Sequence, residues 1–171
     1  MKYEKSNQFF MSYLNDEPEF LKSQFERFYE LMSVPEDARS FPSFDALNLQ
    51  CQPATLYECM FFEYYQENCI NAPAVREKFD LFVAEYNEAK NTFYTKKAEE
   101  ALALLQEEDF TAAVPTNLDS FTPYVKMEGM KQLFFANYAD YQAAFALESL
   151  SNALNNAKST DDTTDDTTDG N

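Results

Sequence analysis

The chain has 171 residues, which is the usual length of one domain and is long enough to bury a substantial core. Its net charge of −17 opposes binding to phosphate backbones and to anionic membrane surfaces, and the absence of histidine removes the commonest general acid–base group and metal ligand. Only two glycines are present, so the turns that tight β-hairpins need are scarce and the sequence predicts an all-α fold.

Two helices are predicted at the start of the chain, at residues 4–14 and from about Pro18 to Ser33. The break between them is expected at Asp16–Pro18, because acidic residues and proline are typical of the first turn of a helix. Phenylalanine and leucine recur at intervals of three and four residues in the second segment, as they do on the buried face of a helix. A connection rich in loops is predicted to follow, up to about residue 52.

A third helix is predicted from Pro53 to about Asn68, and the stretch CMFFEYYQENC begins in it, at residues 59–69. Apolar side chains cover nearly the whole circumference of this helix, which is typical of a helix that is buried or covered by a partner. Ten residues of straight helix separate Cys59 from Cys69 by about 15 Å, too far for a disulfide bond. The stretch is therefore interpreted as a packing or partner-binding element rather than a chemical site.

Two long helices, at about 73–109 and 123–156, are predicted to form a helical hairpin, because only about a dozen residues join them. Apolar residues from Val75 to Phe93 follow a heptad spacing in the first of these helices. The predicted fold is therefore an all-α antiparallel helical bundle that contains this long hairpin. Residues 1–157 are expected to form a single helical domain.

Residues 158–171 repeat the pattern DDTT and contain no apolar side chain, so they are predicted to be a disordered acidic tail. The chain shows no signal-peptide pattern and no apolar stretch long enough to span a membrane. Its three cysteines are an odd number without CxxC spacing, which favours reduced thiols. These features predict a cytoplasmic protein, or one of the host cytoplasm or virion if it is viral, and not a secreted one.

Paired aromatic residues on two of the predicted helices are candidates for partner binding, because aromatic side chains supply much of the binding energy at protein interfaces. The alternative interpretation is that they fill the core of a protein rich in phenylalanine. The candidate partner-binding residues are Phe61, Phe62, Tyr64, Tyr65, Phe134, Phe135 and Tyr138.

Acidic residues near the end of the first long helix suggest a different hypothesis. Carboxylates held on a rigid helix resemble a line of phosphates and would fit the basic groove of a DNA- or RNA-binding protein. A solvated helix face is the simpler interpretation of the same pattern. The candidate mimic surface comprises Glu99, Glu100, Glu107, Glu108 and Asp109.

No catalytic residue, metal-binding residue or cofactor site is predicted. Cysteine lacks a histidine base, serine lacks a G-x-S-x-G elbow, and the chain has no glycine-rich phosphate loop. A tyrosine–carboxylate or lysine enzyme is the remaining catalytic alternative.

The sequence favours a non-catalytic component of a protein–protein interaction or assembly, such as an adaptor, a chaperone or a structural subunit of a larger complex, with a phage or viral setting as one context. Expected partners are proteins with basic or aromatic-accepting surfaces, without direct contact with nucleic acid or membrane, and a homo-oligomer is compatible with the sequence. The alternative function is an acidic inhibitor that mimics nucleic acid.

Overall fold

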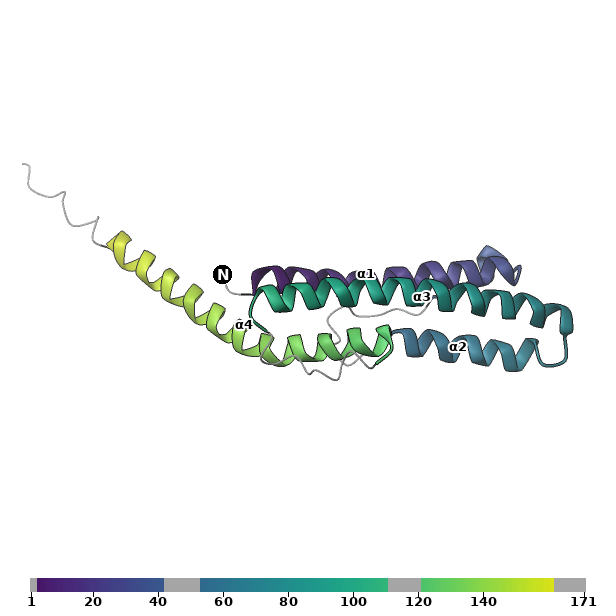
Figure 1. The fold of residues 1–171 in the computed structure, drawn as a ribbon. Helices are drawn as coiled ribbons and strands as arrows, with labels where there is room; N and C mark the ends of the chain where they lie inside the picture. Colours follow the sequence, from purple (N-terminus) through teal and green to yellow (C-terminus); the bar gives the residue numbers. More distant parts are fainter. Residues whose placement is uncertain (1–2, 42–52, 111–120, 162–171) are drawn as a thin grey trace, which may run out of the picture. The chain divides into compact units, whose positions relative to one another are not determined.

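The structure, a computed structural model, describes residues 3–41, 53–110 and 121–161. These residues form α1 (Glu4–Leu31), the short 3₁₀ helix η1 (Glu36–Ala38), α2 (Pro53–Asn68), α3 (Pro73–Glu107) and α4 (Pro123–Asp161) (Figure 1). They contain no β-strand. The predicted all-α helical bundle is confirmed. None of the described helices has the length and apolar character needed to cross a membrane.

The chain divides into two compact units, residues 1–131 and residues 132–171. Unit 1 contains α1, η1, α2, α3 and the first turns of α4, whereas unit 2 contains the remainder of α4. The single domain that was expected for residues 1–157 stays a prediction.

Helices α1 and α3 lie side by side and antiparallel in unit 1 (Figure 1). Three ion pairs join them, and residue numbers rise along α1 while they fall along α3. The pairs are Lys5–Glu107, Asp16–Lys97 and Arg27–Glu85. Two of these pairs, Lys5–Glu107 and Arg27–Glu85, are exposed and contribute little to stability, so the pairing of α1 with α3 depends mainly on the apolar faces between them.

Helix α1 is continuous, so the predicted break at Asp16–Pro18 is wrong. The helix has 28 residues and runs through Pro18, although an internal proline removes a backbone hydrogen bond and costs about 3 kcal/mol or more. Glu17 is buried within the predicted break, and its Oε2 accepts hydrogen bonds from the hydroxyls of Tyr13 and Tyr94 at 2.6 and 2.8 Å. Tertiary contacts on this face of α1 therefore outweigh the local capping signal.

Helix α2 covers the C-terminal half of α1 and the N-terminal half of α3. Phe61 lies at the centre of this contact, with ring centroids 5.1 Å from Phe25, 5.1 Å from Phe28 and 4.7 Å from Phe82. We call these four residues the ring cluster. All four side chains are at most 5% exposed, so this part of the core is almost entirely aromatic.

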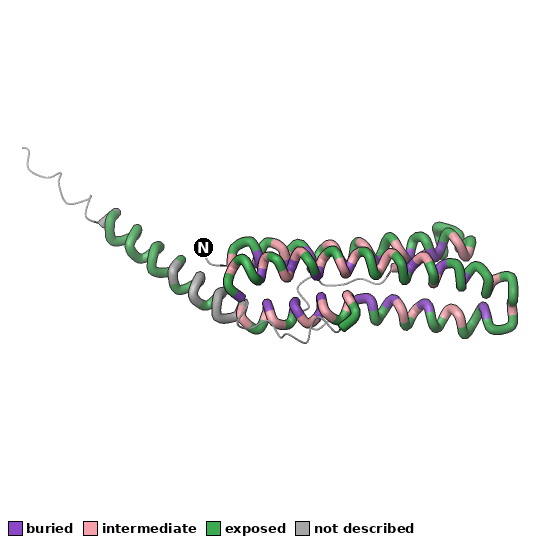
Figure 2. Tube along the Cα trace, in the orientation of Figure 1, coloured by how far each residue is buried: buried purple, intermediate pink, exposed green. Residues whose placement is uncertain are grey.

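The first turns of α4 cover the next stretch of α3. The ring of Tyr124 lies 5.0 Å from the ring of Tyr94, in the middle of α3. The hydroxyls of Thr55 and Tyr124 are 3.3 Å apart, so the start of α2 and the start of α4 meet. In unit 1, the third side of the bundle is therefore formed by two helices placed one after the other, as Figure 2 shows along its lower edge.

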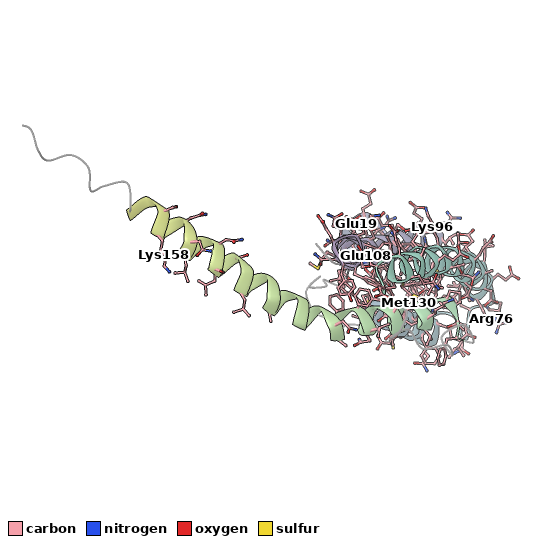
Figure 3. All side chains as sticks on the ribbon, turned by 60° about the vertical axis from the view of Figure 1, so that its left-hand side comes forward. Glu19, Arg76, Lys96, Glu108, Met130 and Lys158 are labelled. Carbon is pink, nitrogen blue, oxygen red and sulfur yellow. The ribbon has the colours of Figure 1, made fainter. Side chains whose placement is uncertain are left out.

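The two long helices of the predicted hairpin are present as α3, with 35 residues, and α4, with 39 residues. Helix α4 continues to Asp161, so residues 158–161, which were predicted to begin the acidic tail, are helical. Lys158 lies in its last turn (Figure 3), where a positive charge complements the negative end of the helix dipole. The rest of the predicted tail, residues 162–171, lies outside the described residues.

Candidate functional site

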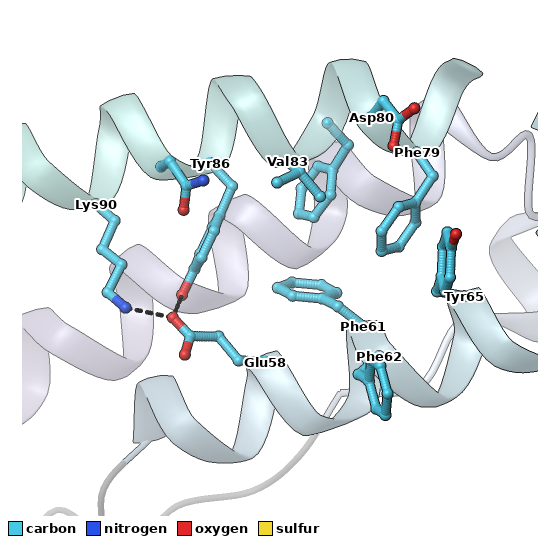
Figure 4. Close-up of a pocket in the computed structure, with 11 residues that line it drawn as sticks. Glu58, Phe61, Phe62, Tyr65, Phe79, Asp80, Val83, Tyr86 and Lys90 are labelled. Carbon is cyan, nitrogen blue, oxygen red and sulfur yellow. Dashed lines mark hydrogen bonds and ion pairs between the residues drawn. The ribbon is translucent and has the colours of Figure 1, made fainter. Parts of the chain in front are cut away.

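A groove of about 580 Å³ lies between α2 and α3 (Figure 4). Phe61 points towards α3 and is 5% exposed, whereas Phe62 points away from α3 and is 59% exposed. Successive residues of an α-helix are rotated by about 100°, which explains why two adjacent phenylalanines differ so strongly in burial. The groove is lined by Glu58, Phe61, Phe62 and Tyr65 of α2 and by Phe79, Asp80, Phe82, Val83, Tyr86, Asn87 and Lys90 of α3.

The α3 wall of the groove is a helical stripe. Phe79, Phe82 and Tyr86 are spaced by three and four residues, so they lie on one face of α3. Phe61 contacts the last of them with a centroid distance of 5.4 Å, and Tyr65 contacts the first at 5.1 Å. The groove is therefore walled by aromatic rings from both helices.

One end of the groove is polar. Glu58 Oε1 accepts a hydrogen bond from the hydroxyl of Tyr86 at 2.9 Å and forms an ion pair with Lys90. Burial, and secondly the nearby charge of Glu58, raises the pKa of Tyr86, so its hydroxyl remains a hydrogen-bond donor. Lys90 also lies over the ring of Tyr124, with its Nζ 4.7 Å from the ring centroid. The groove thus offers rings along most of its length and an ordered polar contact at one end.

The structure brings together three of the four predicted partner-binding residues of α2. Phe61, Phe62 and Tyr65 all line the groove. The fourth, Tyr64, is half-buried and its ring packs edge-on against Phe28 of α1, with a centroid distance of 4.9 Å. Tyr64 is therefore a packing residue.

The other predicted partner-binding residues are in unit 2. Phe134 is buried, Phe135 is half-buried, and their ring centroids are 5.2 Å apart. The position of the Tyr138 side chain lies outside what the structure describes. The described residues that line the groove all belong to unit 1.

Two of the five residues of the predicted mimic surface, Glu107 and Glu108, contact the N-terminus of α1. Glu108 accepts hydrogen bonds from the backbone N–H groups of Lys5 at 2.8 Å and Ser6 at 2.9 Å, so it satisfies the N-terminus of α1. Glu107 forms an ion pair with the side chain of Lys5. The remaining residues of the set differ in exposure, since Glu99 and Asp109 are exposed and Glu100 is half-buried.

A buried polar cluster was not predicted from the sequence. It comprises Tyr13, Glu17, Tyr94, Glu128 and Lys131, and we call it the Glu17 cluster. Glu17 and Lys131 are each 2% exposed and Glu128 is 7% exposed. The Nζ atom of Lys131 donates a hydrogen bond to Glu128 Oε1 at 3.0 Å and lies 2.8 Å from Oε2.

A sequence signal for the Glu17 cluster existed in the apolar pattern of α1. Phe10, Leu14, Glu17 and Leu21 are spaced by four, three and four residues, so Glu17 occupies a position on the buried face. This spacing could have placed Glu17 on the buried face. It could not have identified Tyr94 of α3, whose hydroxyl makes burial of the carboxylate tolerable.

The groups around Glu17 shift its pKa in opposite directions. Burial raises the pKa of Glu17, and the neighbouring charge of Glu128 raises it further, while the Tyr13 and Tyr94 hydrogen bonds and the Lys131 charge act in the opposite direction. Burial also raises the pKa of both tyrosines, which therefore stay protonated and donate to Glu17. Because its charged groups are almost inaccessible, we interpret the cluster as structural.

No described group of three or more histidine, cysteine, aspartate or glutamate residues is arranged to hold a metal ion. Cys59 is an exposed free thiol and Cys69 is a buried one, whereas Cys51 lies outside the described part of the chain. Burial, and secondly the charge of Asp80, raises the pKa of Cys69, so this thiol is a poorer nucleophile than an ordinary cysteine.

Comparison of the chain with protein-family models, with curated proteins and with solved structures finds no match.

Proposed function

We propose that this protein is a non-catalytic component of a protein–protein interaction, and that it binds an apolar segment of its partner in the groove between α2 and α3. The observation that carries the proposal is the aromatic lining of that groove together with the 59% exposure of Phe62 at its edge. Grooves of several hundred Å³ with few polar groups suit apolar ligands. An exposed phenylalanine beside such a groove is a favourable binding hot spot.

The chemistry of the groove favours a particular kind of partner. An amphipathic helix would place its apolar face along the rings, a recurring mode of peptide recognition. The carboxylate of Glu58 is already paired with Lys90, whereas Asp80 is exposed at the other end. With a net charge of −17 on the chain, a partner helix with lysine or arginine beside its apolar face would be attracted electrostatically. Adaptor, chaperone and assembly roles are all compatible with this binding mode.

The proposal can be tested with two variants of the groove and a matched control. Phe62→Ala removes the exposed ring, and Val83→Phe places a larger side chain in the groove. Leu81→Ala is the control, because Leu81 is 52% exposed on α3 but does not line the groove. The partner is captured from the native source, and its affinity for each variant is measured by calorimetry.

Both groove variants should weaken binding at least about tenfold, the effect expected for loss of a hot-spot side chain, while the control stays within about threefold. Circular dichroism would verify that each variant is folded. Equal affinities of wild type, Phe62→Ala and Val83→Phe would contradict the proposal.

A salt titration separates this function from nucleic-acid mimicry. Apolar contacts are weakly screened, so raising the salt from about 0.1 M to about 1 M, where the Debye length falls from about 10 Å to about 3 Å, should weaken binding less than tenfold. The same limit should hold for a variant with Glu99→Gln, Glu100→Gln and Asp109→Asn, which spares the capping residue Glu108. Losses of several orders of magnitude in both experiments, with competition by duplex DNA, would favour the mimic instead.

A further inference from the structure

The Glu17 cluster joins three helices of unit 1. Its members come from α1 (Tyr13 and Glu17), α3 (Tyr94) and α4 (Glu128 and Lys131). The hydroxyls of Tyr13 and Tyr94 hold the Glu17 carboxylate between α1 and α3. On α4, Glu128 and Lys131 form an ion pair, and the charges of both act on Glu17. Charged groups from the first turns of α4, residues 123–131, therefore face a buried carboxylate of α1.

The cluster contains more acidic than basic groups. Two carboxylates, those of Glu17 and Glu128, face the single ammonium group of Lys131, and all three residues are at most 7% exposed. If both carboxylates were ionised, the cluster would carry a net negative charge. A buried charge without compensation is strongly destabilising. The arrangement is therefore neutral only when one carboxylate retains a proton.

The described groups around the cluster do not supply a further positive charge. Lys90 and Lys97 of α3 are paired with Glu58 and Asp16. Burial raises the pKa of four tyrosines on which the charge of Glu17 acts, so these residues stay neutral. They are Tyr13 on α1, Tyr86 and Tyr94 on α3, and Tyr124 on α4.

Glu17 is the carboxylate that retains the proton. Glu128 has the ammonium group of Lys131 as its ion-pair partner. The pKa of Glu17 is raised by burial first and by the charge of Glu128 second. Loss of the Glu17 proton would therefore place two negative charges near each other, out of contact with water.

The first turns of α4 can respond to this charge without opening the rest of unit 1. Helices α1 and α3 are also held together by the ring cluster, whereas the first turns of α4 contact α3 through Tyr124, whose ring lies 5.0 Å from that of Tyr94. Moving Glu128 away would admit water to Glu17 and remove the repulsion between the two carboxylates. Separating α1 from α3 would expose the ring cluster as well, which is more costly.

We propose that docking of the first turns of α4 on α1 and α3 is coupled to the binding of one proton by the Glu17 cluster, so that these turns detach as the pH rises. In the docked state Glu17 holds the proton, and in the detached state the hydrated carboxylate releases it to water. Detachment would uncover Met127 and Met130, which are fully buried in the docked state. The inference uses the Glu17 cluster and does not depend on the partner groove.

The raised pKa of Glu17 gives the sign of the effect. Below the ordinary value of 4.5, Glu17 is protonated in both states, so the docking equilibrium does not change with pH. Between 4.5 and the pKa of the docked state, detachment becomes more favourable by up to about tenfold per pH unit. Above the pKa of the docked state the equilibrium is again independent of pH.

Amide hydrogen exchange of the full chain, followed by mass spectrometry from about pH 5 to about pH 8, tests the proposal. Protection is expressed relative to the intrinsic exchange rate at each pH and is compared between peptides from residues 123–131 and from α2. Glu17→Gln removes the titrating group, and Glu128→Gln removes the second carboxylate. Glu19→Gln is the matched control, because Glu19 is an exposed carboxylate on the same helix. Circular dichroism verifies that each variant is folded.

In the wild type and in Glu19→Gln, protection of residues 123–131 should fall at least about tenfold over this pH range, while protection of α2 changes less than about threefold. Glu17→Gln should show a fall of less than about threefold in residues 123–131. The fall in Glu128→Gln should be smaller than in the wild type, because Lys131 then faces one carboxylate.

Three results would overturn the proposal. The first is a fall of less than about tenfold in the wild type. The second is an equal fall in α2 and in residues 123–131, which would mean that unit 1 unfolds as a whole. The third is a fall as large as that of the wild type in Glu17→Gln or, if that variant does not fold, in Glu128→Gln.

Discussion

The interior of unit 1 is built differently at its two ends. Beside α2 it contains the ring cluster and the aromatic side chains around it, and Phe28 contacts six other aromatic rings there with centroid distances of 4.9 to 6.3 Å. Beside the first turns of α4 it consists of the Glu17 cluster, in which two carboxylates and an ammonium group are nearly inaccessible. Helices α1 and α3 contribute side chains to the interior at both ends.

The difference shows how two kinds of contact place a helix. Burial of rings is nearly non-directional, so many apolar side chains of similar volume would hold α2 against α1 and α3. Buried charged groups tolerate only partners that supply hydrogen bonds and opposite charge in a defined geometry. We therefore expect the ring cluster to supply stability and the Glu17 cluster to select the position of the start of α4.

The largest effect is expected at the ring cluster. Phe28→Ala should lower the free energy of unfolding by about 4–5 kcal/mol, the upper part of the range for a buried phenylalanine, because Phe28 is 1% exposed and its removal leaves a cavity. Phe28→Met, which restores most of the volume, should recover more than half of the loss. Urea unfolding measures both. If Phe28→Met were as unstable as Phe28→Ala, the ring cluster would require a specific side chain, as the Glu17 cluster is expected to do.

A slightly smaller loss is expected when the ammonium group of the Glu17 cluster is removed. Lys131→Met should cost about 3 kcal/mol, the lower part of the range for breaking a buried ion pair, because Glu17 can take up a proton and reduce the uncompensated charge. Adding Glu128→Gln should restore at least half of the lost stability, as measured by a double-mutant cycle in urea. Equal stability of Lys131→Met and wild type would show that the carboxylates of the Glu17 cluster do not need the positive charge of Lys131.

A smaller effect distinguishes the hydrogen-bond role of Glu17 from its charge. Glu17→Leu leaves the hydroxyls of Tyr13 and Tyr94 without their acceptor and should cost about 2 kcal/mol. Glu17→Gln keeps an acceptor oxygen and removes the charge, so it should remain within about 1 kcal/mol of the wild type. Thermal unfolding of the two variants is the comparison to make. If the leucine variant were as stable as the glutamine variant, the hydrogen bonds to Glu17 would not contribute to stability, and the Glu17 cluster would tolerate apolar side chains as the ring cluster does.

The raised pKa of Glu17 predicts a change in relative stability with pH. Above the ordinary value of 4.5 the unfolded chain loses the Glu17 proton while the folded chain retains it, so the free energy of unfolding decreases as the pH rises towards the folded pKa. Glu17→Gln lacks this contribution. The wild type should therefore be more stable relative to Glu17→Gln at pH 5 than at pH 7, as measured by urea unfolding at both values. A difference that is constant with pH, or of opposite sign, would contradict the assignment.

The smallest effect is expected on the outer surface. Arg27 donates hydrogen bonds to Glu85 at 3.0 and 3.2 Å, but both side chains are substantially exposed. Arg27→Gln should shift the melting temperature by less than about 2 °C, because water and salt screen such a pair. A larger shift in thermal unfolding would show that the α1–α3 contact depends on its surface charges as well as on its interior.

The candidate groove was partly predictable from the sequence. Phe61, Phe62 and Tyr65 were recognised as candidates from their density on one helix, and all three line the groove. Phe79 and Val83 were not recognised as part of the site, because their contribution requires α3 to lie opposite α2. The contact of the Tyr64 ring with Phe28 of α1 could likewise not be predicted without knowing that the two helices pack together.

The sequence by itself determined the helical class and the starts of α2, α3 and α4. Prolines at Pro53, Pro73 and Pro123 mark the starts of α2, α3 and α4, because a proline without an N–H is tolerated in the first turn of a helix. The scarcity of glycine pointed away from strands for an equally local reason. Such signals depend on residues within a few positions of one another, so no knowledge of the fold is required to read them.

Only the tertiary structure decided that α1 continues through Pro18 and that Glu17, Glu128 and Lys131 are buried. Locally, an acidic residue before proline indicates a helix start, and an acidic and a basic residue three positions apart indicate a solvated surface. Their burial becomes tolerable only because Tyr94, 77 residues from Glu17 in the sequence, supplies a hydrogen bond and α4 supplies the opposite charge. The desolvation cost of a charge depends on all the groups that surround it in space. The spacing of residues along the sequence does not show which groups of other helices these are.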